Sequence, residues 1–252
     1  MWKTRLGRVI HQSSHGAMVH QNLGYRWLTF GGSAAIQTLI NRRYPEQGGL
    51  TYVPALTIAA QTDPGTCCLL GLGGAGVAHA LRASLGEATL YAIENNQDII
   101  QIAKTYFMSD HIPNLKVIHD DAHRFIHRTT THFKHVIIDL FGAHAFPEHC
   151  FNSDFFAQCR NRLMPEGVLA VNIANTCEQE PILRFMRAHF KQCTVSLPVM
   201  GTANLVLLAS KSESIMPLLD RLRAHQRLKQ LIWDDKWGCI AEIRVLKRPF
   251  WW

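Results

Sequence analysis

The sequence contains no long apolar run, no internal repeat and no low-complexity tract. A membrane-spanning helix needs about 20 consecutive apolar residues, and a signal peptide needs a basic start followed by an apolar run. We therefore expect neither a membrane span nor a secretory leader. The C-x-x-C spacing is also absent, and the seven cysteines are an odd number. This cysteine usage indicates reduced thiols and a cytoplasmic protein.

The composition is that of a globular protein with one core. Of the 252 residues, 47% are hydrophobic and 18% are charged, and the formal net charge is +7. A chain of this length can bury one good core, with room for a small extra lobe. Most basic residues are dispersed, so we do not expect a nucleic-acid partner. A late basic cluster is expected to form a solvated helix face; it comprises Arg221, Arg223, Arg227 and Lys229.

Residues 1–50 differ from the rest of the chain and predict a small antiparallel β lobe with a linker. Short β-prone runs occupy residues 9–10, 17–21 and 25–30, and Asn22-Leu23-Gly24 supplies a turn. Residues 41–49 are rich in Gly, Arg and Pro and are expected to be the linker. A helix over residues 52–61 then leads into the second unit, residues 51–252.

From Thr66 onward, strand-like and helix-like segments alternate, which is typical of an α/β doubly wound, mostly parallel sheet. Strands are expected at 67–72, 89–93, 115–119, 135–139 and 168–172. Helices are expected at 76–85, 97–107, 122–128, 153–163 and 179–189. The late runs 193–197 and 204–209 have no helix between them and can pair antiparallel. Such a finish is characteristic of Rossmann-like, methyltransferase-type folds.

The run from Cys67 to Gly76 is the strongest motif, because it reads as a buried strand, a glycine turn and a helix start. Gly71 allows a tight turn, Gly73 lets the backbone approach a ligand, and Gly76 lets the helix sit against the strand. The next apolar run closes on Glu94, where a carboxylate can accept hydrogen bonds from both hydroxyls of a ribose. A cofactor that contains a nucleoside is expected at this edge of the sheet.

Further acidic residues come after later strands. Asp120 and Asp121 come after the third strand, and Asp139 ends the fourth. Ligands of open α/β sheets bind outside these carboxyl ends, so the side chains are expected to face one crevice with Glu94. For Asp121, capping of the next helix is an equally simple role.

Together these residues make the chain resemble the spermidine synthase-like family of class I S-adenosylmethionine-type transferases. The resemblance covers about residues 8–210. Its elements are the loop 71–76, Glu94, Asp121-Ala122, the run 136–139, and the segment from Pro147 through Phe155-Phe156 and 165–167 to Asn172.

The resemblance implies a role for each matching residue. The glycine loop, with Gly71, Gly73, Gly74 and Gly76, approaches the amino acid-derived tail of the cofactor. Glu94 binds ribose, and Asp121 with Ala122 meets adenine. Asp139 orients and deprotonates the attacking amine, and Tyr52 helps bind the substrate. The implied cofactor is S-adenosylmethionine or its decarboxylated form, with no metal.

The substrate half of the motif departs from the family. Gly142 stands where spermidine synthases carry a second aspartate, and Val53-Pro54 comes after Tyr52 instead of histidine and glutamate. The hairpin end at residues 28–32 lacks the usual Asp-Gly. The loop after Asp139 offers replacements in His144, Glu148 and His149, of which His144 is our catalytic candidate. The alternative is an ordinary polar surface loop.

Two other groups of residues fall outside the motif. His119, His123 and His127 are spaced by four, which indicates a solvent-facing helix stripe or, alternatively, a metal site. The aromatic residues of the last segment are expected to pack on the core, or else to form a homodimer contact. They are Trp233, Trp237, Phe250, Trp251 and Trp252.

The sequence therefore predicts aminopropyl transfer to a small-molecule amine or another nucleophile. Methyl transfer from S-adenosylmethionine to a small molecule is the closest alternative. An NAD-dependent oxidoreductase built on the same glycine loop is a second alternative. A catalytically silent binding module is a third.

Overall fold

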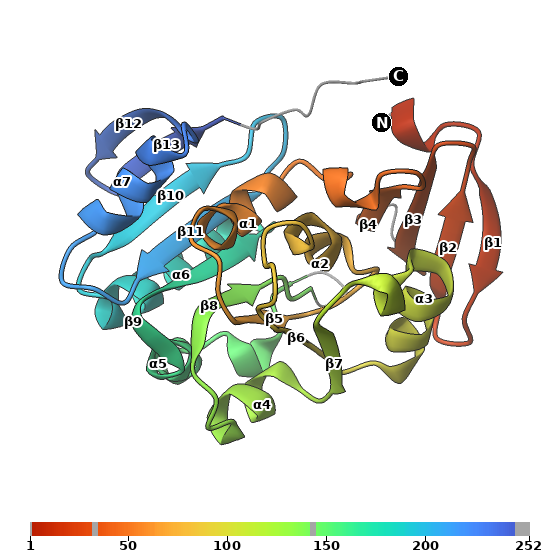
Figure 1. Cartoon of the computed structure of the whole chain (residues 1–252), viewed down its shortest axis with the longest axis horizontal. Helices are drawn as coiled ribbons and strands as arrows, with labels where there is room; N and C mark the ends of the chain where they lie inside the picture. The colour runs from red at the N-terminus through yellow and green to blue at the C-terminus, as the bar shows by residue number, and fades with distance from the viewer. Residues whose placement is uncertain (1, 32–34, 142–144, 245–252) are drawn as a thin grey trace.

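The computed structural model describes residues 2–31, 35–141 and 145–244, which form a large mixed sheet and a small antiparallel one (Figure 1). The predicted α/β class, with a mostly parallel sheet and an antiparallel N-terminal lobe, is confirmed. Within the described residues no helix is both long and apolar enough to cross a membrane.

The small sheet has four strands in the order β1 (Arg8–Gln12), β2 (Ala17–Gln21), β3 (Tyr25–Phe30) and β4 (Ile36–Asn41). The first three match the prediction, whereas β4 was not predicted. Its residues Thr38, Leu39 and Ile40 are buried in succession, so the strand lacks the apolar–polar alternation that marks a half-exposed strand. The short turn η2 (Pro45–Gln47) then leads to α1 (Val53–Thr62).

The large sheet has the order β12-β13-β10-β11-β9-β8-β5-β6-β7. Its parallel half contains β5 (Cys67–Leu70), β6 (Leu90–Glu94), β7 (Leu115–His119), β8 (Phe133–Ile138) and β9 (Leu163–Ile173). The predicted antiparallel finish is confirmed, because β11 (Leu205–Ser210) pairs antiparallel with both β9 and β10 (Thr194–Pro198).

Helices cover both faces of the large sheet. One face packs against α1, α2 (Gly76–Leu81) and α7 (Met216–Ala224), and the other against α4 (Ala122–Arg128), α5 (Ser153–Asn161) and α6 (Thr176–His189). Strand β5 shows why both layers form, since Cys67 and Leu69 face the first layer while Cys68 and Leu70 face the second. A strand buried on both faces reads as a continuous apolar run.

A separate apolar cluster joins the small sheet to the large one. Val19, Leu28 and Ile40 of the small sheet pack against Ile102 and Phe107 of α3 (Gln97–Phe107). Figure 1 shows the N-terminal sheet beside α3 at one end of the molecule and the C-terminal hairpin at the opposite end. The lobe is thereby held against the edge of the large sheet at which the glycine loop lies.

Several predicted boundaries were wrong. Strand β9 begins at Leu163 instead of 168, so it includes residues 165–167, whose Pro-Glu-Gly sequence is typical of a turn, and Glu166 takes a left-handed φ of 57°. Helix α2 stops at Leu81 instead of continuing to 85, and α6 begins at Thr176 instead of 179.

The region after Ser210 was not predicted in detail. Helix α7 leads into the hairpin β12 (Leu228–Asp234) and β13 (Gly238–Ile243), which extends the large sheet. The basic cluster is therefore not one helix face, because Arg227 comes after α7 and Lys229 lies in β12. Arg221 is also not a freely solvated side chain, since its guanidinium forms ion pairs with Asp63 and Glu166.

The aromatic prediction is only partly right. Trp237 packs on the core, but the Trp233 side chain in β12 is 77% exposed. Phe250, Trp251 and Trp252 lie outside the described residues.

Candidate active site

A cavity of about 220 Å³ lies where the carboxyl ends of β5, β6 and β8 meet the N-terminal lobe. Its walls come from β4, the start of α1, the glycine loop, the ends of β6 and β8, and the loop before α5. This is the position at which open α/β sheets bind their ligands. The cavity combines an apolar lining with a few polar groups, as small-molecule sites do.

The glycine loop turns tightly at the end of β5. Gly71 has a φ of +94°, and a Cβ placed there would lie 2.3 Å from the backbone oxygen of Asp139. Any other residue at this position would push β5 and β8 apart or strain the turn. Gly71, Gly73 and Gly76 all line the cavity, as the motif predicted.

Glu94 holds this loop in place. Its Oε2 accepts hydrogen bonds from the backbone N–H groups of Leu72 and Gly73 at 3.1 and 3.3 Å, while Oε1 accepts from Asn96 N–H at 3.1 Å. The carboxylate is half-buried and lines the cavity. A negative side chain therefore occupies the amide donors with which glycine loops ordinarily cradle a phosphate.

Thr38 of β4 fixes the same loop from the N-terminal lobe. The buried Gly74 N–H donates to Thr38 Oγ1 at 2.9 Å, and the Thr38 methyl group packs within 3.3 Å of a Cβ placed at Gly76. Gly74 thus lies behind the cavity and is not among the described residues that line it. Sequence reasoning missed Thr38, because no motif links a lone threonine to a loop 36 residues away.

Asp121 has both of the roles that the sequence left open. Its Oδ1 accepts from Arg124 N–H at 2.9 Å as the N-cap of α4, and its Oδ2 hydrogen-bonds His149 Nε2 at 2.8 Å. Partial burial raises the pKa of this carboxyl, but the hydrogen bonds from Arg124 and His149 outweigh burial and lower it. Asp121, Ala122 and His149 all line the cavity.

Asp139, directly after β8, lies at the centre of a polar chain at the cavity wall. Its Oδ2 accepts from the Tyr52 hydroxyl at 3.0 Å, and its Oδ1 accepts from Asn172 Nδ2 at 3.0 Å. Asn172 is in turn held by Asn204, whose Nδ2 donates to Asn172 Oδ1 at 2.9 Å. Burial raises the pKa of Asp139 to about 6, against the lowering effect of the hydrogen bonds from Asn172 and Tyr52.

The loop after Asp139 lies partly outside the described residues. Gly142 and the catalytic candidate His144 belong to that gap, so both stay sequence predictions. Of the alternatives in the same loop, His149 reaches the cavity, whereas Glu148 begins the short turn η4 (Glu148–Cys150) and does not line it.

The charge of the cavity is its most selective property. Three carboxylates line it, those of Glu94, Asp121 and Asp139. Among the described residues of its lining there is no lysine or arginine, and His149 is the one basic side chain. This arrangement favours a ligand that carries positive charge and disfavours one with a pyrophosphate or a free carboxylate.

The family model of the spermine/spermidine synthase domain matches residues 72–207, which is more than half of the chain. The chain belongs to the spermine/spermidine synthase family. The matched stretch contains Glu94, Asp121, Asp139 and Asn172, while Tyr52 and Thr38 lie before it.

Two polyamine aminopropyltransferases are distant relatives of this chain. It is 25% identical to a polyamine aminopropyltransferase of Nitrosomonas europaea over 194 residues, covering 72% of this chain and 58% of the relative. It is also 25% identical to that of Vibrio vulnificus over 179 residues, covering 67% of this chain and 60% of the relative. The chain therefore spans less than two thirds of the length of these relatives.

The fold is also that of solved spermidine synthases. A crystal structure of spermidine synthase in complex with the transition-state analogue AdoDATO superposes with a TM-score of 0.64 at 17% sequence identity. The match covers 81% of this chain and 74% of that one. At this identity the likeness establishes the shared fold.

Proposed function

We propose that this member of the spermine/spermidine synthase family transfers an aminopropyl group from decarboxylated S-adenosylmethionine to an amine. Family membership supports the reaction type, and the curated relatives named above are polyamine aminopropyltransferases. The proposal assigns cofactor binding to Gly71, Gly73, Glu94, Asp121 and Ala122.

The charge of the cavity is the observation that carries this proposal. Decarboxylated S-adenosylmethionine has a sulfonium and an ammonium group and no carboxylate, so it complements a lining with three carboxylates and no described lysine or arginine. Ordinary S-adenosylmethionine would bring a carboxylate without a cationic partner. NAD would bring a pyrophosphate to a loop whose Leu72 and Gly73 amides already donate to Glu94.

The polar groups of the described lining residues suit decarboxylated S-adenosylmethionine. Glu94 offers carboxylate oxygens at the position where ribose hydroxyls bind in this fold. Asp121 and Ala122 line the adjoining wall, where adenine is expected. The cofactor supplies an alkyl group on a positively charged sulfur, which leaves as a neutral thioether.

Asp139 is the proposed base. Its carboxylate accepts a proton from the attacking amine, and its pKa of about 6 leaves it deprotonated at neutral pH. Tyr52 and Asn172 each donate to a different oxygen of Asp139 and so fix the plane of the carboxylate. Holding the amine in line with the reacting carbon then supplies much of the acceleration.

The remaining assignments extend the same proposal. The proposal takes residues 1–50 as an N-terminal β lobe with a linker, and residues 51–252 as the transferase domain. All seven cysteines are free thiols, which supports a reducing, cytoplasmic setting. A homodimer contact in the last segment stays a prediction.

Product analysis tests the proposal. The chain is incubated with decarboxylated or with ordinary S-adenosylmethionine and a panel of mono-, di- and polyamines. Methylthioadenosine and the modified amines are detected by mass spectrometry. We expect methylthioadenosine together with an amine whose mass has increased by an aminopropyl group. Methylated products from S-adenosylmethionine would replace the proposal with methyl transfer, and cofactor binding without any product would indicate a silent binding module.

A further inference from the structure

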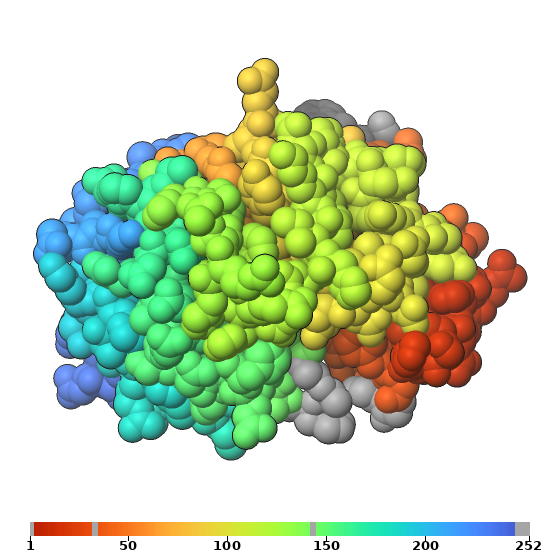
Figure 2. All heavy atoms as spheres, turned by 90° about the horizontal axis from the view of Figure 1, so that it is seen from below, coloured from red at the N-terminus to blue at the C-terminus, as the bar shows by residue number. Residues whose placement is uncertain are grey.

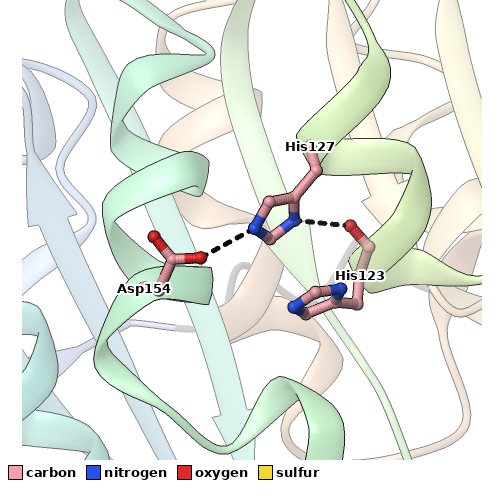
Figure 3. A group of neighbouring side chains, drawn as sticks. All are labelled: His123, His127 and Asp154. Carbon is pink, nitrogen blue, oxygen red and sulfur yellow. Dashed lines mark hydrogen bonds and ion pairs between the residues drawn. The ribbon is translucent and has the colours of Figure 1, made fainter.

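Two histidines and an aspartate meet on the surface of the molecule, at the junction between α4 and α5. His123 and His127 are one turn apart on α4, and Asp154 lies in the first turn of α5. Figure 3 shows the His127 imidazole directed at the Asp154 carboxylate, with the His123 ring beside it. None of the three lines the cavity described above.

The distances between these side chains suit a shared ligand. One potential donor atom from each residue lies within 4.8 Å of those of the other two, and His127 Nε2 is 2.8 Å from Asp154 Oδ2. Zinc bonds of about 2.0–2.2 Å place tetrahedral ligand atoms roughly 3.3 Å apart. The Asp154 side chain is 65% exposed, so it can rotate to adjust to an ion.

The orientation of His127 is already that of a metal ligand. Its Nδ1 donates to the backbone oxygen of His123 at 2.7 Å, so a zinc ion at Nε2 would take the place of the proton that Nε2 shares with Asp154. Metal-binding histidines ordinarily donate their second ring N–H to a carbonyl or carboxylate in this way. Nε2 is thereby directed at Asp154 and at the open side of the cluster.

We propose that His123, His127 and Asp154 bind one zinc ion, with a water molecule in the fourth position. Two imidazoles and a carboxylate form a ligand set that zinc commonly takes. Because the ligands come from two helices, the ion would link α4 to α5. Figure 2 shows α4 and α5 next to each other on the same open face, so the ion can enter from solvent.

Zinc titration of the untagged, chelator-treated chain against a zinc-binding chromophore tests this proposal. We expect one zinc ion per wild-type chain. Removing a residue that only hydrogen-bonds to a metal ligand typically weakens metal binding at least about tenfold. Asp154→Asn and His127→Ala each alter a direct ligand, so each should weaken zinc binding by at least that factor. His132→Ala and Cys177→Ser change an exposed histidine and an exposed thiol outside the cluster and should bind like wild type.

Thermal melting with and without zinc provides the second readout. Zinc should raise the melting temperature of the wild type and of His132→Ala, but not that of Asp154→Asn, because an ion that binds only the native state stabilises it. Circular dichroism in the absence of zinc verifies that the variants are folded. Zinc binding of unchanged affinity in Asp154→Asn and His127→Ala, or no zinc uptake by the wild type, would overturn the proposal.

Discussion

Tyr52 donates a hydrogen bond of 3.0 Å to Asp139, joining the residue before α1 to the residue after β8. The two side chains are 87 positions apart in the chain and meet at the wall of the cavity. Burial next to Asp139 raises the pKa of Tyr52 well above its ordinary value, so its hydroxyl keeps its proton and acts as a donor. The proposed function depends on this half-buried carboxylate at the cavity wall.

Replacement of Asp139 by Asn should abolish most of the activity. The amide cannot accept a proton from the amine, and general-base catalysis contributes typically about 10²–10⁴ in rate. We expect kcat to fall by about that factor while methylthioadenosine still binds. Asp110→Asn, an exposed aspartate outside the cavity, serves as the matched control and should leave kcat unchanged.

The same variant should not lose stability at neutral pH. The pKa of Asp139 is about 6 in the folded chain and 3.8 ordinarily, so the folded state binds the proton more tightly and stability falls as pH rises from 3.8 to about 6. The charged side chain thus costs at most about 3 kcal/mol at pH 7. Urea unfolding of Asp139→Asn at pH 7 should give a free energy equal to or above that of the wild type. A clear loss would show that the carboxylate contributes to stability.

The pH dependence of kcat/KM should report the same carboxyl group. Activity requires the deprotonated form of Asp139, so kcat/KM should be high above pH 6 and fall as pH decreases through about 6. Tyr52→Phe removes a hydrogen bond that lowers the pKa, so the acidic limb should move to higher pH. Tyr44→Phe, outside the cavity, should leave the limb in place. A limb that stays fixed in Tyr52→Phe would exclude Asp139 as its source.

Glu94→Gln should weaken nucleoside binding and loosen the glycine loop. A carboxylate accepts from Leu72 and Gly73 more strongly than an amide oxygen does, and hydrogen bonds to charged groups contribute about 1 kcal/mol more than neutral ones. We expect the Kd of methylthioadenosine to rise by about tenfold, measured by calorimetry. Glu87→Gln, an exposed residue between α2 and β6, is the control. Equal affinity in Glu94→Gln would remove Glu94 from the nucleoside site.

Thr38→Val should uncouple the N-terminal lobe from the glycine loop. Valine fills the same space but cannot accept from the buried Gly74 N–H, and an unsatisfied buried donor costs about 1–3 kcal/mol. The free energy of unfolding should fall by this amount, and methylthioadenosine should bind more weakly. Thr38→Ser keeps the oxygen and should retain most of the affinity. If Thr38→Val loses no more stability and affinity than Thr38→Ser does, the hydrogen bond from Gly74 to Thr38 does not hold the loop.

The cofactor half of the site could be predicted from the sequence because its residues lie at or just after the ends of strands. The carboxyl ends of parallel strands share one edge, so Gly71, Glu94, Asp121 and Asp139 had to converge once the strands were identified. No sequence pattern predicts contacts between residues that are far apart in the chain. Thr38 reaches the loop from a strand that is buried on both sides, and Asn172 and Tyr52 hydrogen-bond to Asp139 from positions 33 and 87 residues away.

The boundary errors have local physical causes. Pro165-Glu166-Gly167 reads as a turn, yet Glu166 absorbs the bend in a left-handed conformation, so β9 continues through it. The hairpin β12–β13 alternates only weakly in burial because it forms the edge of the sheet, with Ile232 and Trp233 exposed. Neither feature can be deduced from residue type alone.

Calorimetric titration of one protein sample with decarboxylated and with ordinary S-adenosylmethionine tests the central claim most directly. The two ligands differ by a carboxylate, for which the described lining of the cavity offers no lysine or arginine. We predict that the decarboxylated form binds at least about tenfold more tightly, which corresponds to about 1.4 kcal/mol. Equal or tighter binding of ordinary S-adenosylmethionine, or binding of NAD instead of either, would contradict the proposed function.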